Sequence, residues 1–321
     1  MVQRSLENWL TTPIKPCQIK KVMYLDWSNR NPAEVKWINE IPSECTFKKT
    51  ILWKDINIEI ILCGKIRSGN IFNEVEEKYK NFSYLKSHLQ KCIRKGFDNQ
   101  AIKTAKHMMK MDMINFIRRL TVIMVEDVIL HESFGILLWL SISNIEITNY
   151  HAQWLLGVVY ILCKNRTKDV LIIPNNKKTT LQCLLNSKYL NLNEYQYSIL
   201  YSLKLRQSYG GLKCDVELFG KTADCWYNRF ITSEKINVAS DIIRPIRLIL
   251  PDLNLEDWDL SAIDYHCAKF LLKIVLKEYE EYSEQKIKSL IWNFSSNINY
   301  RIKQKNVDSD WLKIRNFVKK K

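Results

Sequence analysis

Apolar side chains recur every three or four positions from residue 81 to residue 163, and this period constrains the fold most strongly. The spacing places them along one face of a helix, so it predicts consecutive amphipathic helices. Glycine and proline are scarce, with 8 and 7 residues, which also favours helices over a many-stranded β fold. We therefore expect a mainly α protein. Its first helices are expected at 83–95, 99–111, 114–130, 134–142 and 149–163.

The clearest strand signal lies within residues 47–66. Two runs rich in β-branched and aromatic residues, Thr50–Trp53 and Ile56–Leu62, flank Lys54 and Asp55. This pattern predicts an N-terminal β-hairpin ahead of the helices. Residues 63–70 partly imitate a phosphate-binding loop, but the Lys and the Ser or Thr that must follow its second glycine are missing. We expect a loop there, and no nucleotide.

Polar stretches divide the chain into four predicted segments. Residues 1–20 form a tail, and residues 21–80 form a small β-containing segment. Residues 81–165 are expected to be a first helical domain, and residues 166–321 a second helical domain with a basic tail. Together they would make a two-part helical bundle. The expected helices of the second part are 178–187, 193–207, 213–230, 260–282 and 284–302.

The positive charge is unevenly distributed along the chain. The formal net charge is +15, and it is carried by two regions, +7 over Phe82–Arg119 and +8 from Gln285 to the end. Two basic patches on a neutral body are typical of a protein that binds a polyanion. A generally lysine-rich surface is the alternative. We expect contacts to nucleic-acid phosphates from Lys91, Arg94, Lys95, Lys103, Lys106, Lys110, Lys319, Lys320 and Lys321.

Residues 3–10 form a short amphipathic motif, Gln-Arg-Ser-Leu-Glu-Asn-Trp-Leu. The motif resembles the PCNA-interacting peptide, in which a Gln is followed by an aliphatic residue and two aromatic ones. One tight helical turn would place the apolar side chains on one side as a plug for a pocket on the sliding clamp. The resemblance makes Leu6 and Trp9 the anchors, with Leu10 beside them, and Gln3 a polar latch. Leu10 departs from the family pattern, which has a second aromatic residue there.

A second resemblance concerns about 50 residues of the helical region. The order of Leu89–Lys95, the alanines 101 and 105, Arg118-Arg119-Leu120 and Glu126-Asp127 is similar to the helical collar of clamp-loader-type ATPases. The chain also resembles uncharacterised proteins of large DNA viruses and protists. These relatives imply no defined activity. The 81 residues before this region are too few for an ATPase core.

Several polar residues have a simpler structural interpretation. Arg118 and Arg119 with Glu126 and Asp127 stand in an otherwise apolar helix and predict buried ion pairs. Asp264 and His266 are two apart and would point in opposite directions on a helix, so His266 is expected in the core. Asp215 and Glu217 could contribute to a metal site only with distant carboxylates. Residues 209–211, Tyr-Gly-Gly, predict a turn.

The 9 cysteines are scattered without Cys-x-x-Cys spacing, which predicts reduced thiols and neither disulfides nor zinc. We expect no metal and no cofactor. No apolar stretch is long enough for a membrane span, and the first residues do not look like a signal peptide. The expected location is the nucleus or a viral replication site.

The leading functional hypothesis is a DNA-binding accessory factor of replication or repair that is tethered to PCNA. Other protein subunits are possible partners, because the most apolar helices leave room for one. The second hypothesis is an enzyme acting on DNA, such as a structure-specific nuclease or a glycosylase. The third is an RNA-binding or assembly protein in which the N-terminal motif is accidental. The sequence names no catalytic residue for any of them.

Overall fold

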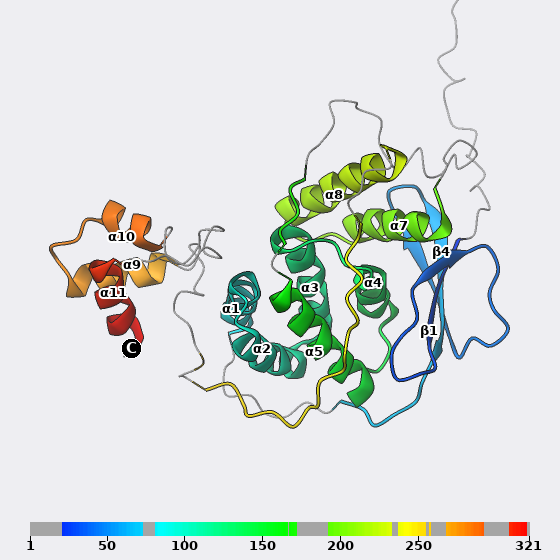
Figure 1. Cartoon of the computed structure of the whole chain (residues 1–321), viewed down its shortest axis with the longest axis horizontal. Coiled ribbons are helices and arrows are strands. Elements are labelled where there is room, and N and C mark those ends of the chain that lie inside the picture. The colour runs from blue at the N-terminus through cyan, green and yellow to red at the C-terminus, as the bar shows by residue number, and fades with distance from the viewer. Residues whose placement is uncertain are drawn as a thin grey trace, which may run out of the picture.

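The computed structural model describes residues 21–72, 81–165, 167–171, 192–232, 237–254, 257, 268–291 and 308–319. The protein is mainly helical there, with ten helices and one small four-stranded sheet near the N-terminal end. The sheet, a central helical body and three C-terminal helices follow one another along the longest axis (Figure 1). The expected mainly α architecture with a small β element is confirmed.

The sheet is mixed and contains more strands than the sequence pattern predicts. Its strands are β1 (Lys21–Trp27), β2 (Lys36–Ile38), β3 (Phe47–Trp53) and β4 (Ile58–Ile66), in the order β2-β1-β4-β3. The expected pair, β3 and β4, is antiparallel, with Trp53 opposite Ile58. The strands β1 and β2 are additions. The long-range partner of β1 is β4, to which it runs parallel.

The segment that imitates a phosphate-binding loop begins in this sheet. Residues 63–66 belong to β4 rather than to the expected loop, because β1 pairs with all four of them and β3 pairs with the first two. Gly64 is required by the packing of β4. A Cβ atom at this position would lie 2.9 Å from the Leu25 carbonyl oxygen and 3.0 Å from the Trp139 ring. The glycine therefore permits close approach within the sheet.

Seven helices form the central body, and their bounds lie close to the expected ones. They are α1 (Phe82–Lys95), α2 (Asp98–Met111), α3 (Met113–Asp127), α4 (Phe134–Ser143), α5 (Asn149–Lys164), α7 (Glu194–Ser208) and α8 (Lys213–Thr232). Helix α1 ends at Gly96, as expected, with φ of 75°. Helix α3 stops at Asp127, because Val128 is extended. The expected helix at 178–187 lies outside the described residues.

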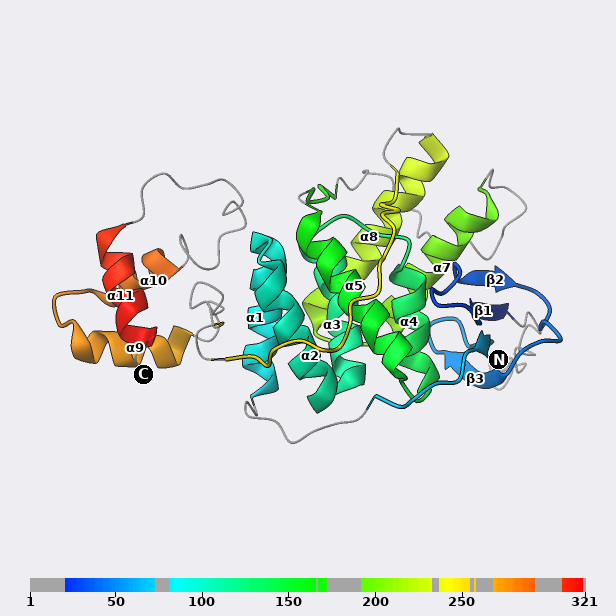
Figure 2. The same ribbon diagram turned by 60° about the horizontal axis from the view of Figure 1, so that its bottom comes forward.

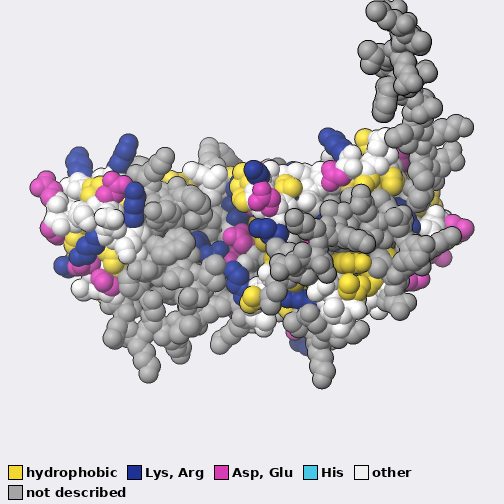
Figure 3. All heavy atoms as spheres, turned by 90° about the horizontal axis from the view of Figure 1, so that it is seen from above, with side chains coloured by type: hydrophobic (Ala, Val, Ile, Leu, Met, Phe, Trp, Pro, Cys, Tyr) yellow, Lys and Arg dark blue, Asp and Glu magenta, His cyan; other side chains and the backbone are white. Residues whose placement is uncertain are grey.

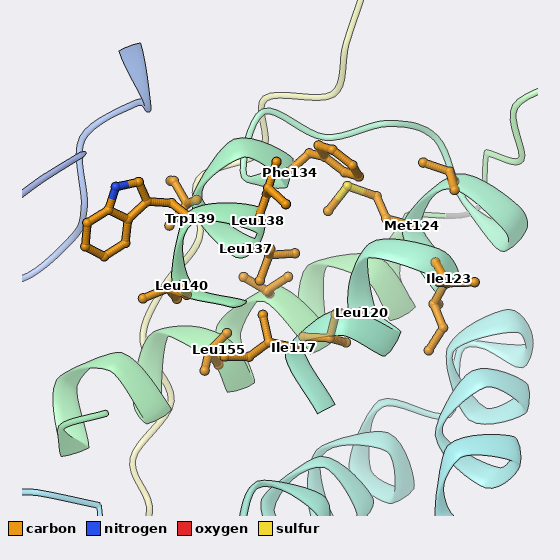
Figure 4. Close-up of a cluster of buried hydrophobic side chains, with 14 of the residues drawn as sticks. Ile117, Leu120, Ile123, Met124, Phe134, Leu137, Leu138, Trp139, Leu140 and Leu155 are labelled. Atoms are coloured by element: carbon orange, nitrogen blue, oxygen red, sulfur yellow. The ribbon is translucent and has the colours of Figure 1, made fainter. Parts of the chain in front are cut away.

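One hydrophobic core joins the inner face of the sheet to these helices. Every residue of α4 is buried, as its apolar sequence predicts. In Figure 4, Ile117 and Leu120 of α3 converge with Leu137 of α4 and Leu155 of α5. The Trp139 indole anchors α4 to the sheet by donating to the Met23 carbonyl at 3.2 Å.

Helices α7 and α8 belong to the same core. Helix α7 packs on α4, α8 and β2, and α8 also contacts α3. The Trp53 indole donates to the Ser208 hydroxyl at 2.8 Å, and the Trp37 indole donates to Ser202 at 3.2 Å. The cluster continues to Leu253. The predicted boundary between residues 165 and 166 therefore falls within one continuous core, and the domain limits remain predictions.

The three C-terminal helices have a small core of their own. They are α9 (Ala268–Glu278), α10 (Glu284–Ile291) and α11 (Ser309–Lys319). Helices α9 and α10 lie inside the expected helices 260–282 and 284–302, whereas α11 is unexpected. Their buried side chains form a cluster separate from the central core: Leu272, Val275, Tyr282, Ile287, Leu290, Trp311 and Ile314.

Candidate nucleic-acid interface

The predicted lysine stripe lies on one face of α2, as the spacing of Lys103, Lys106 and Lys110 requires. These side chains are only 12%, 13% and 15% exposed. Asp257 shields Lys103, and Lys106 and Lys110 are shielded by an extended segment, residues 237–254, which we call the strap. It crosses α5 and α2 in Figure 2, where it is the yellow trace. The stripe is therefore covered within the chain.

Asp252 of the strap and Asp257, which lies just beyond it, pair with the stripe. The Lys103 ammonium lies 2.7 Å from an Asp257 oxygen. One oxygen of Asp252 lies 3.3 Å from the Lys106 nitrogen and 3.9 Å from that of Lys110. Lys106 also donates to the Leu250 carbonyl at 2.8 Å. These lysines therefore contact carboxylate and carbonyl oxygens of their own chain.

The ionisation of both aspartates reflects these contacts. The hydrogen bond from Lys106, together with its charge, holds the pKa of Asp252 below its usual range. Burial alone would raise the pKa of Asp257, but the Lys103 hydrogen bond and the Asn254 backbone N–H outweigh it and lower the pKa. Both carboxylates are therefore fully charged at neutral pH.

The strap is held at several points along the central helices. The Ala239 N–H donates to the Leu130 carbonyl, and the His131 Nε2 lies 3.1 Å from the Asp241 carbonyl oxygen. Farther on, the Ile246 N–H donates to the Gln153 carbonyl at 2.9 Å. Gly157 of α5 allows this approach, because a Cβ there would lie 2.5 Å from the Arg244 carbonyl oxygen.

Side chains of the strap alternate between the core and solvent. Ile243, Ile246, Leu248 and Leu250 pack on the central core, and Leu253 is buried in it. The other face carries two arginines, 244 and 247, and two isoleucines; Ile249 is 92% exposed. The apolar face therefore attaches the strap, and its charged face lies outward.

Two predicted phosphate contacts lie inside the body instead of on its surface. Lys91 and Arg94 of α1 are both buried. The Arg94 Nε donates to Asp127 of α3 at 2.6 Å, and the Gln90 amide donates to the other oxygen at 2.7 Å. Lys91 and Arg94 therefore face the protein interior, so we leave them out of the candidate interface. Lys95, in the last turn of α1, is half-buried.

The same network accounts for the predicted buried ion pairs. Asp127 is paired, as expected, but its closest partner is Arg94 of α1 and not an arginine of its own helix. Arg119 donates to the Gln90 side-chain oxygen. Its neighbour Arg118 turns the other way and donates to the Tyr209 carbonyl at 3.0 Å. The four polar groups at Gln90, Arg94, Arg119 and Asp127 tie α1 to α3.

The Tyr-Gly-Gly turn after α7 has the positive φ angles predicted for its glycines, 74° at Gly210 and 136° at Gly211. Arg206 donates to the Gly210 carbonyl at 2.8 Å and to Thr121 at 3.1 Å. Burial, followed by the charge of Arg118, lowers the pKa of Arg206 to about 10. Positive side chains at the C-terminal end of α7 interact favourably with the negative end of its helix dipole. Arg118 and Arg206 therefore have a structural role.

The C-terminal helices carry both signs of charge. Asp310 of α11 accepts hydrogen bonds from Lys286 and, at 2.8 Å, from the Tyr282 hydroxyl. Lys288 pairs with Glu284 within α10. Figure 3 shows basic and acidic side chains interspersed over this end of the molecule. The net positive charge of the region therefore comes from basic residues other than these paired ones.

Some predicted residues lie outside the described part of the chain. They include the whole clamp-docking motif, with Gln3, Leu6, Trp9 and Leu10, and also Asp264, His266, Lys320 and Lys321. Lys319 is the last residue of α11. Asp215 and Glu217 lie in the first turns of α8, and the Lys213 ammonium is 4.0 Å from Glu217. Among the described residues, no group of three or more His, Cys, Asp or Glu is placed to hold a metal ion.

Sequence reasoning missed the acidic partners of the stripe. Asp252 and Asp257 follow Lys106 and Lys103 by 146 and 154 residues, so no local spacing connects them. The available signal was weak. Pro251 favours an extended conformation for the residue before it, and Asp252 stands between Leu250 and Leu253, which is compatible with an extended segment that carries an acid.

Comparisons with protein families, curated proteins and solved structures found no match to this chain. None of the helices in the described ranges has the length and apolar character needed to cross a bilayer.

Proposed function

We propose that the protein is a DNA-binding accessory factor of replication or repair that docks onto the sliding clamp PCNA. The observation that carries the proposal is the motif of residues 3–10, with its polar latch at Gln3 and its anchors at Leu6 and Trp9. The motif precedes Lys21, where the first strand of the body begins. The charge of +15 supplies a second, independent argument for a polyanionic partner.

The body would contact DNA through phosphates and not through base edges. Basic side chains give affinity without sequence preference, and each contact adds to the salt dependence. We assign these contacts to Lys95, to the stripe Lys103, Lys106 and Lys110, and to the C-terminal lysines 319–321. The two parts of the proposed helical bundle are residues 81–165 and 166–321. The expected place of action is the nucleus or a viral replication site.

Tethering explains why modest intrinsic affinity is sufficient. A clamp-bound motif keeps the body close to the DNA that the clamp encircles, so the second binding event becomes intramolecular. The effective DNA concentration is then in the millimolar range for a short linker. Weak, sequence-independent phosphate contacts would be nearly saturated under these conditions.

Capture of the purified clamp by the full chain tests the docking half of the proposal. Replacing Leu6→Ala together with Trp9→Ala removes both anchors and should weaken capture at least about a hundredfold, because aromatic and aliphatic anchors dominate small interfaces. The matched control is Glu7→Ala with Asn8→Ala, which changes the two neighbouring positions that point away from the pocket. Equal capture by wild type and the anchor variant would rule out docking by this motif.

A further inference from the structure

The two carboxylates that cover the lysine stripe are placed as intramolecular competitors of phosphate would be. One Asp252 oxygen is shared between Lys106 and Lys110, at 3.3 and 3.9 Å, as a phosphate oxygen would be. Asp257 forms a shorter pair with Lys103 at 2.7 Å. Two carboxylates thus occupy the positions that backbone phosphates would take along α2.

Exposure of the partners differs in a way that suits displacement. The three lysine side chains are at most 15% exposed and that of Asp257 is 13% exposed, whereas that of Asp252 is 77% exposed. Asp252 therefore lies over Lys106 and Lys110 on the solvent side. A nucleic acid approaching this face would meet Asp252 first and would have to replace it to reach the stripe.

Among the described residues, the part of the strap beside the stripe is held by the Leu250 carbonyl, by Asp252 and by Leu253. Asp252 is an exposed partner, and exposed ion pairs contribute little to stability. The apolar attachment of this stretch is Leu253, which is buried, with Leu250 packed partly beside it. A polyanion offers several phosphates at once and releases counterions on binding, which an internal carboxylate does not. Competition between the two is thus feasible.

We infer that residues 250–254 and Asp257 form an autoinhibitory cover whose carboxylates occupy the α2 lysine stripe until DNA phosphates displace them. The inference rests on the proposed function, since it assigns a regulation to the same basic stripe. Nucleic acid binds weakly while the cover is in place. It binds more tightly once Lys103, Lys106 and Lys110 are free to contact phosphates.

The test measures affinity of the full chain for a duplex DNA over a range of salt concentrations. Asp252→Asn with Asp257→Asn keeps side-chain size and removes the competing charges. Affinity should rise about tenfold at moderate salt, and the slope of log K against log salt should steepen by up to about 2.7, or about 0.9 for each lysine released. Leu253→Ala, which removes the apolar attachment but no charge, should change affinity in the same direction.

Two controls separate release of the stripe from a general loss of negative charge. Glu40→Gln with Glu59→Gln removes the same charge from exposed positions outside α2 and the strap and should leave the salt slope unchanged. Adding Lys103→Gln, Lys106→Gln and Lys110→Gln to the aspartate variant should abolish its gain.

The outcomes distinguish this inference from the proposed function. The wild-type protein could bind DNA while the aspartate variant shows no higher affinity and no steeper salt slope than the charge control. That result overturns the autoinhibitory cover and leaves the proposed function standing. Binding by neither protein overturns both. Weak binding by wild type and tight, strongly salt-dependent binding by the aspartate variant supports the cover.

Discussion

Arg94 and Asp127 form a buried ion pair across α1 and α3, with the Arg94 Nε 2.6 Å from an Asp127 oxygen. Both side chains are shielded from water, so each charge depends on the other. The Gln90 amide satisfies the second oxygen of the carboxylate at 2.7 Å. This arrangement gives a basic residue of the first positive region a structural role, which its sequence context alone does not reveal.

Removal of the carboxylate should therefore destabilise the central body. Asp127→Ala removes the closer of the two carboxylates that pair with Arg94 and leaves the buried charge with the more distant Glu126, so the free energy of unfolding should fall by about 3 kcal/mol. Urea denaturation followed by circular dichroism measures it. Glu126→Gln is the matched control, because the Glu126 side chain is 40% exposed and lies 3.8 Å from Arg94. A loss below 1 kcal/mol for Asp127→Ala would show that the pair is not structurally important.

The contact between Gly157 and the strap predicts a local effect of a single methyl group. Alanine is preferred over glycine inside a helix by about 1 kcal/mol. In Gly157→Ala, however, the new Cβ would collide with the Arg244 carbonyl oxygen, 2.5 Å away. We expect net destabilisation of about 1–2 kcal/mol and faster hydrogen exchange of the Ile246 amide, which donates to Gln153.

Gly96→Ala is the comparison for this experiment. Gly96 has φ of 75° and caps α1, and a Cβ there would meet the Cys163 carbonyl oxygen and not the strap, so its replacement is also strained. It should lower overall stability while the Ile246 amide keeps its protection relative to global unfolding. The same local exchange change in both variants would contradict a specific contact between α5 and the strap.

Much of the central fold follows from the sequence because its signals are local. Periodicity places α1, α2, α4 and α5 within a residue or two of the observed bounds, and Gly96 marks a helix end as expected. The strands β1 and β2 were missed. Strand β1 pairs with the distant β4, as in the parallel register of Leu25 with Gly64, and the three-residue β2 pairs with β1.

The candidate interface, likewise, could be predicted from the sequence only in part. The lysines of α2 share one face because helical spacing alone decides it. What lies against them does not follow from spacing, since the partners Asp252 and Asp257 come from an extended segment more than 140 residues away. Burial of Lys91 and Arg94 likewise depends on α3 and on the packing of the whole body.

His151 makes stability depend on pH in a defined window. Its imidazole lies beside the Trp27 ring, and its Nδ1 accepts from the Thr148 N–H at 3.0 Å. Burial lowers the pKa of His151 to about 4, against an ordinary value of 6.5. The unfolded chain therefore binds a proton more readily than the folded one, so stability falls as pH drops from about 6.5 towards 4 and is fully present above that window.

The loss attributable to His151 should reach up to about 3 kcal/mol at pH 4. His151→Gln removes the titration while a glutamine at this position can still accept from the Thr148 N–H. The difference in unfolding free energy between pH 7 and pH 4 should be smaller in the variant than in wild type. An identical difference in both proteins would exclude His151 as a source of acid sensitivity.

The affinity of the full chain for a primed circular DNA, with and without a loaded PCNA clamp, tests the central claim most directly. Clamp-tethered binding predicts that loading the clamp raises the apparent affinity about a hundredfold or more. It also predicts that Leu6→Ala with Trp9→Ala removes this gain and leaves the clamp-free affinity intact. Equal affinity with and without the clamp in the wild-type protein would contradict the account.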